Sequence, residues 1–226
     1  DISKGKIRIY TPDFPVFGIH YASRYSDSSV IIPYVGFNVY ILQLSSMDTT
    51  NLVHIYPFCL KRRLEHMRIS PNKNLLVFAG LDSVKSKFLP CYPTGVVKLG
   101  SDTLDDIYVY NIPEKTLNQL TNTNCCDRDP TWLPDGEHIA FSSNRTGNFE
   151  IYVMDKDGKN VKQLTNNVED DVMPEYSPDG DRIAFISGKR EGKGQIWLMN
   201  TDGSNIQQLT DLEDGAYGPL SWSPAQ

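Results

Sequence analysis

Charged side chains gather in the polar segments between the short apolar runs of this chain. Three such segments, "NTNCCDRD", "NNVEDD" and "DLEDGAYG", are rich in carboxylates, whereas "PFCLKRRLEH" is basic. The side chains of interest are Lys61, Arg62, Arg63, His66, Asp127, Arg128, Asp129, Glu169, Asp170, Asp171, Glu213 and Asp214. A surface that is acidic on one arc and basic on another suits an oriented protein partner. The alternative is that these loops are solvated and that their Asp side chains bond local backbone amides.

Calcium binding is a second chemistry that the sequence suggests and then argues against. "DKDGKN", residues 155–160, opens like an EF-hand loop. Its twelfth position is Asn166 instead of a bidentate Glu, and no flanking helical pattern is present. A hairpin turn explains the motif better. No ligand spacing among the clustered carboxylates argues for a cation, so we predict no metal and no cofactor.

Signatures of catalysis are absent from the sequence. There is no GxSxG nucleophile elbow, and "GKREGKG", residues 188–194, lacks the GxxxxGK[ST] pattern of a phosphate-binding loop. His20, His54, His66 and His138 are widely separated, with no HExxH pair for zinc. We therefore predict a protein that is not an enzyme.

Length and charge narrow the classes of protein further. The 226 residues, 39% of them hydrophobic, allow a substantial core. The net charge of −6 argues against a nucleic-acid partner, and no run approaches the roughly 18 apolar residues of a membrane helix. The chain begins at Asp1 with neither an initiating Met nor a signal-peptide core. We expect a processed or trimmed chain from which a leader could have been removed.

The cysteines leave the compartment open. The four are Cys59, Cys91, Cys125 and Cys126, without a CxxC pair. Their even number permits two disulfides, although the adjacent Cys125 and Cys126 could be bridged only with strain. Free thiols are equally consistent with this pattern.

A repeat in the sequence indicates which strands hold these polar segments in place. Short aromatic strands are followed by turns at Pro71, Pro134, Pro178 and Pro224, with a degenerate copy at Ser26. The copies lie 44 to 46 residues apart, apart from one interval of 63 that contains an insertion at 83–101. Two further anchors keep this register, an aromatic residue in a β-branched run and the triplet "QLT". They fall at Tyr40, Tyr108, Tyr152 and Trp197, and at 119–121, 163–165 and 208–210.

Each copy predicts four short strands. In the third copy these are Pro130–Leu133, His138–Ser142, Glu150–Met154 and Val161–Leu164. Pro presets the first position of the "PDG" turn, and Gly takes the position that needs a positive φ. β-Branched and aromatic residues fill the strand runs, as a packed pleated surface favours. A four-stranded unit that recurs every 40 to 50 residues is typical of a β-propeller, so the predicted fold class is all-β.

The repeats resemble those of TolB-like (WD-like) β-propellers. The resemblance is carried by "QLTNTNCCDRDPTWLPDGEHIAFSSNRTGNFEIYVMDKDG" and "QLTNNVEDDVMPEYSPDGDRIAFISGKREGKGQIWLMNTDG". It is strong over residues 104–226, fair for 66–80 and weaker before that. Departures are Leu133 in place of the usual Ser and "SPAQ" in place of the final "SPDG".

The repeats predict one propeller domain over residues 1–226. Complete units span about 16–56, 64–121, 129–165 and 172–210. Residues 6–10 and 219–223 are left over, as the last and first strands of a further blade. Because an incomplete blade would expose apolar edges, we expect a portion of a longer propeller, six-bladed as the resemblance implies. The alternative is a small ring of four to five blades with an irregular closure.

Function is expected at loops, since rigid scaffolds present binding residues there. The resemblance implies a non-catalytic interaction scaffold or complex subunit, exported to the periplasm or cell surface. Its partner would bind the loop rim or the 83–101 insertion, where Phe88, Leu89 and Tyr92 are too apolar for an idle loop. The insertion could equally fold back on its own blade. Alternative functions are the substrate-gating propeller of a prolyl-oligopeptidase-type serine peptidase, whose catalytic domain is absent here, and a channel-site lyase.

Overall fold

The computed structural model describes residues 23–26, 29–34, 38–43, 49–54, 65–81, 105–188, 194–213, 215–216, 218 and 220–222. The chain divides into two compact units, Asp1–Tyr56 and Pro57–Gln226. Several predicted features lie outside the described residues. These are the strand at 6–10, Cys59, Cys91, the basic residues Lys61, Arg62 and Arg63, the insertion with Phe88, Leu89 and Tyr92, and Asp214.

The first unit contains one antiparallel sheet. Its strands are β1 (Ser23–Ser26), β2 (Ser29–Tyr34), β3 (Asn38–Gln43) and β4 (Thr49–His54), paired in that order. The prediction of strands in the least regular copy of the repeat is therefore confirmed.

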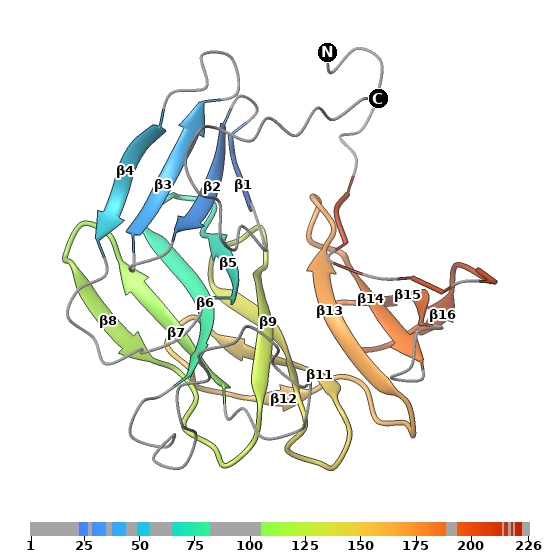
Figure 1. Ribbon diagram of the computed structural model, residues 1–226. Helices are drawn as coiled ribbons and strands as arrows, with labels where there is room; N and C mark the ends of the chain where they lie inside the picture. The colour runs from blue at the N-terminus through green and yellow to red at the C-terminus, as the bar shows by residue number, and fades with distance from the viewer. Residues whose placement is uncertain are drawn as a thin grey trace, which may run out of the picture. The chain divides into compact units, whose positions relative to one another are not determined.

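The second unit contains three more antiparallel sheets, each of four strands consecutive in sequence (Figure 1). The β5 blade consists of β5 (Glu65–Ile69), β6 (Leu75–Leu81), β7 (Asp105–Asn111) and β8 (Thr116–Gln119). The β9 blade consists of β9 (Asp127–Trp132), β10 (His138–Ser143), β11 (Glu150–Asp155) and β12 (Lys162–Gln163). The β13 blade consists of β13 (Asp170–Tyr176), β14 (Arg182–Gly188), β15 (Gln195–Asn200) and β16 (Gln207–Gln208). The all-β class and the four-stranded antiparallel blades were both predicted correctly. None of the described residues belongs to a helix long and apolar enough to cross a membrane.

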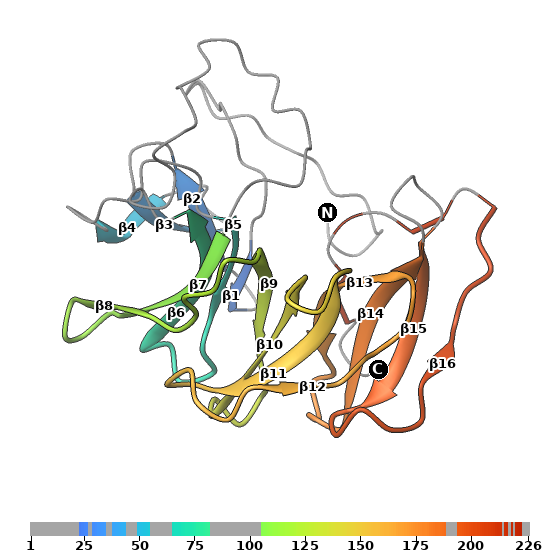
Figure 2. The ribbon, with the colours of Figure 1, turned by 90° about the horizontal axis from the view of Figure 1, so that it is seen from below.

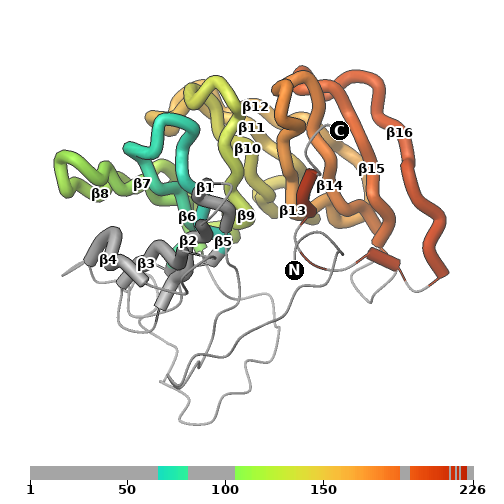
Figure 3. Tube along the Cα trace, turned by 90° about the horizontal axis from the view of Figure 1, so that it is seen from above, coloured from blue at the N-terminus to red at the C-terminus, as the bar shows by residue number. Residues whose placement is uncertain are grey.

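The three blades of the second unit pack face to face (Figures 2 and 3). Ile107 of the β5 blade and Phe141 of the β9 blade belong to one buried cluster, and Ile151 of the β9 blade and Phe185 of the β13 blade belong to a second. All four side chains are at most 1% exposed. Burial of such side chains stabilises the fold by about 2 kcal/mol each, so the interfaces between blades form the core of this unit.

The "QLT" triplet has a structural role in these blades. The Thr165 hydroxyl donates to Glu150 Oε2 over 2.6 Å and accepts from the Ile151 amide over 2.9 Å. The Asn167 amide donates to Glu150 Oε1 over 2.8 Å. Equivalent groups in the other two blades are Thr121 with Asp106 and Thr210 with Gln195. The triplet recurs because its Thr closes the same polar network in each of these three blades.

The turns between third and fourth strands rest on the preceding blade. Gly158 has a φ of +82°, and a Cβ there would lie 2.7 Å from the Leu120 carbonyl oxygen. Gly203, with φ +90°, stands in the same way over Leu164. Within "DKDGKN", the Gly158 amide donates to the Asp155 carbonyl and the Asn160 side-chain amide donates to Asp155 Oδ2. The motif is thus a hairpin turn, for which glycine is needed on steric grounds.

Candidate functional site

The first strands of the three blades share one irregularity. Each contains a register shift, and the residue at the shift adopts a left-handed backbone, with φ of 51° at His66, 55° at Asp129 and 55° at Met173. Each of these residues stands five positions before the Pro of the following turn. A bulge bends a strand and redirects its side chains, so equivalent side chains from three blades converge here.

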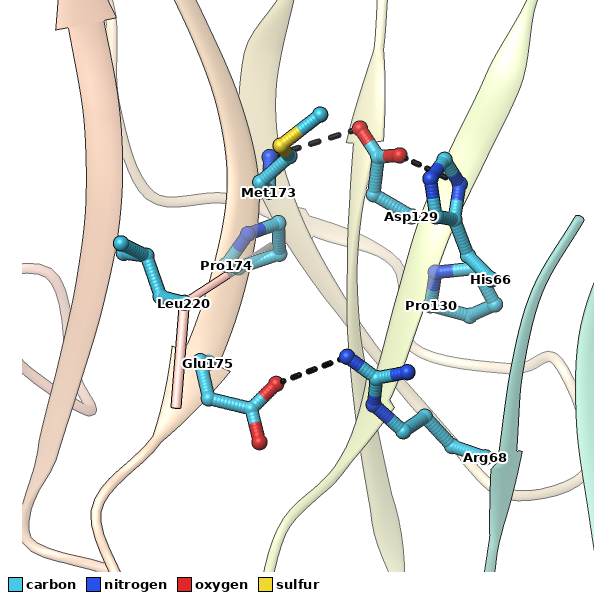
Figure 4. A pocket seen from close by; sticks show the side chains of 8 residues that line it. All are labelled: His66, Arg68, Asp129, Pro130, Met173, Pro174, Glu175 and Leu220. Carbon is cyan, nitrogen blue, oxygen red and sulfur yellow. Dashed lines mark hydrogen bonds and ion pairs between the residues drawn. The ribbon is translucent and has the colours of Figure 1, made fainter. Parts of the chain in front are cut away.

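The converging side chains line a pocket (Figure 4). Its lining residues are His66, Arg68, Asp129, Pro130, Met173, Pro174, Glu175 and Leu220. The space between them, including the solvent at the mouth, is about 240 Å³. Most of this space is open to solvent, and the enclosed part is about 10 Å³, room for about one water molecule. A ligand would therefore contact the pocket from its mouth instead of being enclosed by it.

One polar layer of the pocket is centred on Asp129. His66 Nδ1 lies 2.6 Å from Asp129 Oδ1, while the Ser142 hydroxyl donates to Oδ2 over 3.1 Å and the Met173 amide donates to it over 3.4 Å. Burial by itself would raise the pKa of Asp129, but His66, Arg128 and the Ser142 bond hold it well below its usual range. The carboxylate is therefore charged and ties three blades together.

The second polar layer joins Arg68, Thr131 and Glu175, which again occupy equivalent positions. Arg68 Nη2 donates to Glu175 Oε2 over 3.4 Å, and the Thr131 hydroxyl donates to the same oxygen over 3.4 Å. Burial raises the pKa of Glu175, and Arg68 and Thr131 only partly offset this. The Arg68 and Glu175 side chains are 20% and 23% exposed, so this layer is open to a ligand.

The comparisons with known proteins agree with the propeller fold. Residues 142–226 match the family model described as "TolB beta propeller domain". The predicted resemblance to TolB-like β-propellers is therefore confirmed for this part of the chain. A search of curated proteins found no match.

Solved propellers show the same fold at low sequence identity. TolB from Acinetobacter baumannii is 17% identical, with a TM-score of 0.57 over 81% of this chain and 41% of that one. An oligogalacturonate lyase in complex with manganese is 13% identical, with a TM-score of 0.58 over 81% and 50%. Puromycin hydrolase is 13% identical, with a TM-score of 0.60 over 87% and 31%. The chain thus spans less than half the length of the TolB structure, and the likeness concerns the fold alone.

The predicted acidic residues lie in two environments, the buried first strands of the blades and the connections between blades. Asp127, Asp129 and Asp171 lie within first strands and are at most 5% exposed. Glu169 and Glu213 lie in connections, and Glu213 is exposed. The acidic residues differ in burial because the first strand of each blade begins several residues before the position predicted from the turn. Part of each acidic segment therefore belongs to the sheet.

Three further predicted side chains, His66, Arg128 and Asp170, interact with other residues of the protein. His66 joins Asp129, as described above. The Arg128 guanidinium stacks on the Phe149 ring at 3.8 Å, and Asp170 Oδ1 accepts from the Phe149 amide over 2.9 Å. Of the described part of the predicted rim, only His66 and Asp129 line the pocket.

Arg68, Met173 and Glu175 are among the pocket residues that were not singled out from the sequence. They lie in strands beyond the charged connections, and the Arg68–Glu175 pair joins residues 107 apart in sequence. The repeat register held a usable signal. In the β5, β9 and β13 blades, positions three and five before the turn Pro hold a different residue type each time, whereas the Thr of "QLT" is the same in all three.

Proposed function

We propose that this chain is a non-catalytic binding domain that recognises a protein partner through the pocket at its first strands. One observation carries the proposal. The three blades of the second unit keep the Thr of the polar network, yet they differ at the two converging layers of the pocket. These are His66, Asp129 and Met173 in one layer and Arg68, Thr131 and Glu175 in the other.

The physical reason is that folding imposes the same demands on every blade. The Thr network meets those demands in all three blades, and the turn glycines meet them in the β9 and β13 blades. Folding does not fix the residue type at a partly exposed position, so the blades can carry different side chains there to bind one ligand. In the second layer these side chains include a hydrogen-bond donor from one blade and an acceptor from another. Arg68 and Glu175 offer this combination to an extended polypeptide segment, with Pro130, Pro174 and Leu220 as apolar walls.

The exposed acids of the connections have a supporting role in this proposal. Glu213 carries a charge that would steer a basic surface of the partner, mainly through the association rate. Binding through the 83–101 insertion stays a prediction, because that segment lies outside the described residues.

Site-specific photo-crosslinking in the native host tests the proposal. A benzophenone amino acid replaces Leu220, which lines the pocket, and in a matched variant it replaces Gln207 on the exposed strand β16. We expect a crosslinked protein adduct from position 220 that is absent from position 207 and reduced when Arg68→Ala is added. Equal adducts from both positions would overturn the pocket as the binding site.

The non-catalytic part of the proposal needs its own measurement. A fluorophosphonate probe is applied to the complete native protein, with a known serine hydrolase as positive control. We expect no labelling. Labelling would instead support the substrate-gating propeller of a serine peptidase.

Export is proposed on the resemblance of the repeats to TolB-like propellers. The outermost envelope layer of the source cells is made permeable while the cytoplasmic membrane stays intact, and protease is added. We expect the protease to degrade this protein and to leave a cytosolic marker intact. Equal protection of both proteins would contradict export.

A further inference from the structure

The pocket contains a methionine whose environment differs from that of the other described methionines. Met67, Met154 and Met199 are buried, at most 1% exposed. Met173 is half-buried and lines the pocket. An oxidant dissolved in water reaches a thioether at the mouth of a pocket, whereas it reaches a core thioether only when the fold opens locally. Among the residues that the structure describes, Met173 is therefore the methionine most accessible to oxidation.

The backbone of Met173 is held in place. Its amide donates to the Ser142 hydroxyl oxygen over 3.2 Å and to Asp129 Oδ2 over 3.4 Å. Its φ of 55° lies in the left-handed region, which a non-glycine residue adopts only where its surroundings enforce it, and the buried Pro174 follows. Because the strand is not free to move away, a change in the polarity of the Met173 side chain acts inside the pocket.

The neighbours of Met173 make such a change consequential. In Figure 4 its side chain lies in the part of the pocket that holds Asp129 and His66, apart from Arg68 and Glu175. His66 and Asp129 occupy the equivalent positions of the other two blades and pair over 2.6 Å. Oxidation to the sulfoxide turns the apolar thioether into a polar hydrogen-bond acceptor. This layer would thus gain an acceptor next to a charged carboxylate, without gaining a donor, and the pocket would lose part of its apolar wall.

From the exposure of this side chain and its fixed backbone we propose that Met173 is an oxidation site for peroxides, and that its sulfoxide weakens binding in the pocket. The thioether sulfur attacks one oxygen of the peroxide, so that an S–O bond forms and the O–O bond breaks. The proton of the transferred hydroxyl passes to the leaving hydroxide, which departs as water. Sulfur is oxidised by two electrons and the peroxide is reduced by the same two. The effect on binding rests on the proposed function of the pocket, whereas the oxidation does not.

Timed oxidation of the complete native protein tests the modification site. The protein is exposed to dilute hydrogen peroxide, and peptide mass spectrometry measures the sulfoxide fraction at each methionine. Val168→Met, at a position that is 91% exposed, supplies the rate of a solvated thioether. We expect Met173 to react at least about 10-fold faster than the three buried methionines. A Met173 rate as slow as theirs, while the Val168→Met position reacts fast, would overturn the proposal.

A second measurement follows the effect on binding. Source cells with the benzophenone amino acid at position 220 are treated with hydrogen peroxide before irradiation, and the adduct yield is compared with the Met173 sulfoxide fraction. We expect the yield to fall about 5-fold as Met173 becomes oxidised, because a polar group replaces an apolar contact. In the Met173→Leu control, which has no thioether at this position, peroxide should leave the yield at its own untreated value.

The outcomes of this measurement separate the two proposals. An adduct yield that stays constant while Met173 becomes oxidised would overturn the effect on binding and leave the pocket as the binding site. An equal fall in the Met173→Leu control would overturn it as well, since the loss would then arise elsewhere. A complete lack of adduct before peroxide is added would overturn the proposed function together with its control by oxidation. The oxidation site itself is decided by mass spectrometry in every case.

Discussion

The β9 and β13 blades carry a buried aspartate at the same position, and the two aspartates differ in their partners. In the strand register, Asp127 of β9 stands opposite Ser143 of β10, and Asp171 of β13 stands opposite Ser187 of β14. Both aspartates are 0% exposed. Asp127 Oδ1 accepts from Arg145 Nη2 over 3.0 Å. Within the described residues, Asp171 has no such cation.

This difference changes the electrostatics of each blade. Asp171 Oδ2 accepts from the Asn167 side-chain amide over 2.8 Å. Burial raises its pKa to about 6, the hydrogen bonds of Ser187, Thr165 and Asn167 lower it in part, and the charge of Glu150 raises it. The comparison teaches that one position of a repeat can hold an ion pair in one blade and, among the residues that the structure describes, a carboxylate bonded only by neutral groups in the next.

Removing the cation of the β9 blade should have the largest effect. Arg145→Met leaves Asp127 buried without its partner, so we expect a loss of about 3 kcal/mol in the free energy of unfolding, measured in urea. The control is Arg182→Met, which changes an exposed arginine and should cost less than about 0.5 kcal/mol. Equal, small losses in both variants would remove the ion pair as the source of the difference between the blades.

The turn glycines allow a second comparison of the same two blades. Gly158→Ala places a methyl group 2.7 Å from a carbonyl oxygen at a φ of +82°, and Gly203→Ala places one at 3.0 Å. We expect losses of about 3 and about 2 kcal/mol, from backbone strain plus overpacking. Gly136→Ala has a similar φ of +73°, but its nearest contact is a side chain at 3.6 Å, so about 1 kcal/mol is expected. Thermal unfolding measures the stability of the three variants. Equal losses of stability in all three would mean that backbone strain alone, without overpacking, destabilises them.

Most of the fold could be predicted because its determinants are local. In the β9 blade the four predicted strands all occur. The first begins at Asp127 instead of Pro130, since the bulge at Asp129 bends the strand without ending it. The fourth shortens to Lys162–Gln163.

The site was less predictable because its determinants are long-range. A carboxylate looks the same in sequence whether it faces solvent or lies in a buried network. The partner of Asp127 is Arg145, which lies 18 residues away, beyond an entire hairpin. The Arg68–Glu175 contact needs three blades to be assembled before it exists. Charge clustering therefore indicated the right segments but not the exposure of their side chains.

The two equivalent aspartates should respond to amidation with opposite signs. The folded-state pKa of Asp171 is raised from 3.8 to about 6, so the fold prefers its protonated form. The stability from this group is complete below about pH 4 and is lost as the pH rises through about 6. Asp171→Asn should therefore gain about 2 kcal/mol at pH 8 and nothing at pH 4. Asp127→Asn should lose stability at pH 8, and urea unfolding at both pH values measures this. A loss for both variants at pH 8 would contradict the assignment of Asp171 as an uncompensated charge.

The Thr network gives the smallest and finest test of the comparison. Thr165→Val removes the hydroxyl that the Ile151 amide and Glu150 Oε2 both bond, so we expect a loss of about 2 kcal/mol. Thr210→Val affects a neutral, partly buried Gln195, so about 1 kcal/mol is expected. Thr116→Val, on the exposed face of β8, is the control and should change little in the same urea titration. Equal losses at positions 165 and 210 would show that Gln195 makes as strong a network as Glu150. The difference between the two blades would then rest on Asp127 and Asp171 alone.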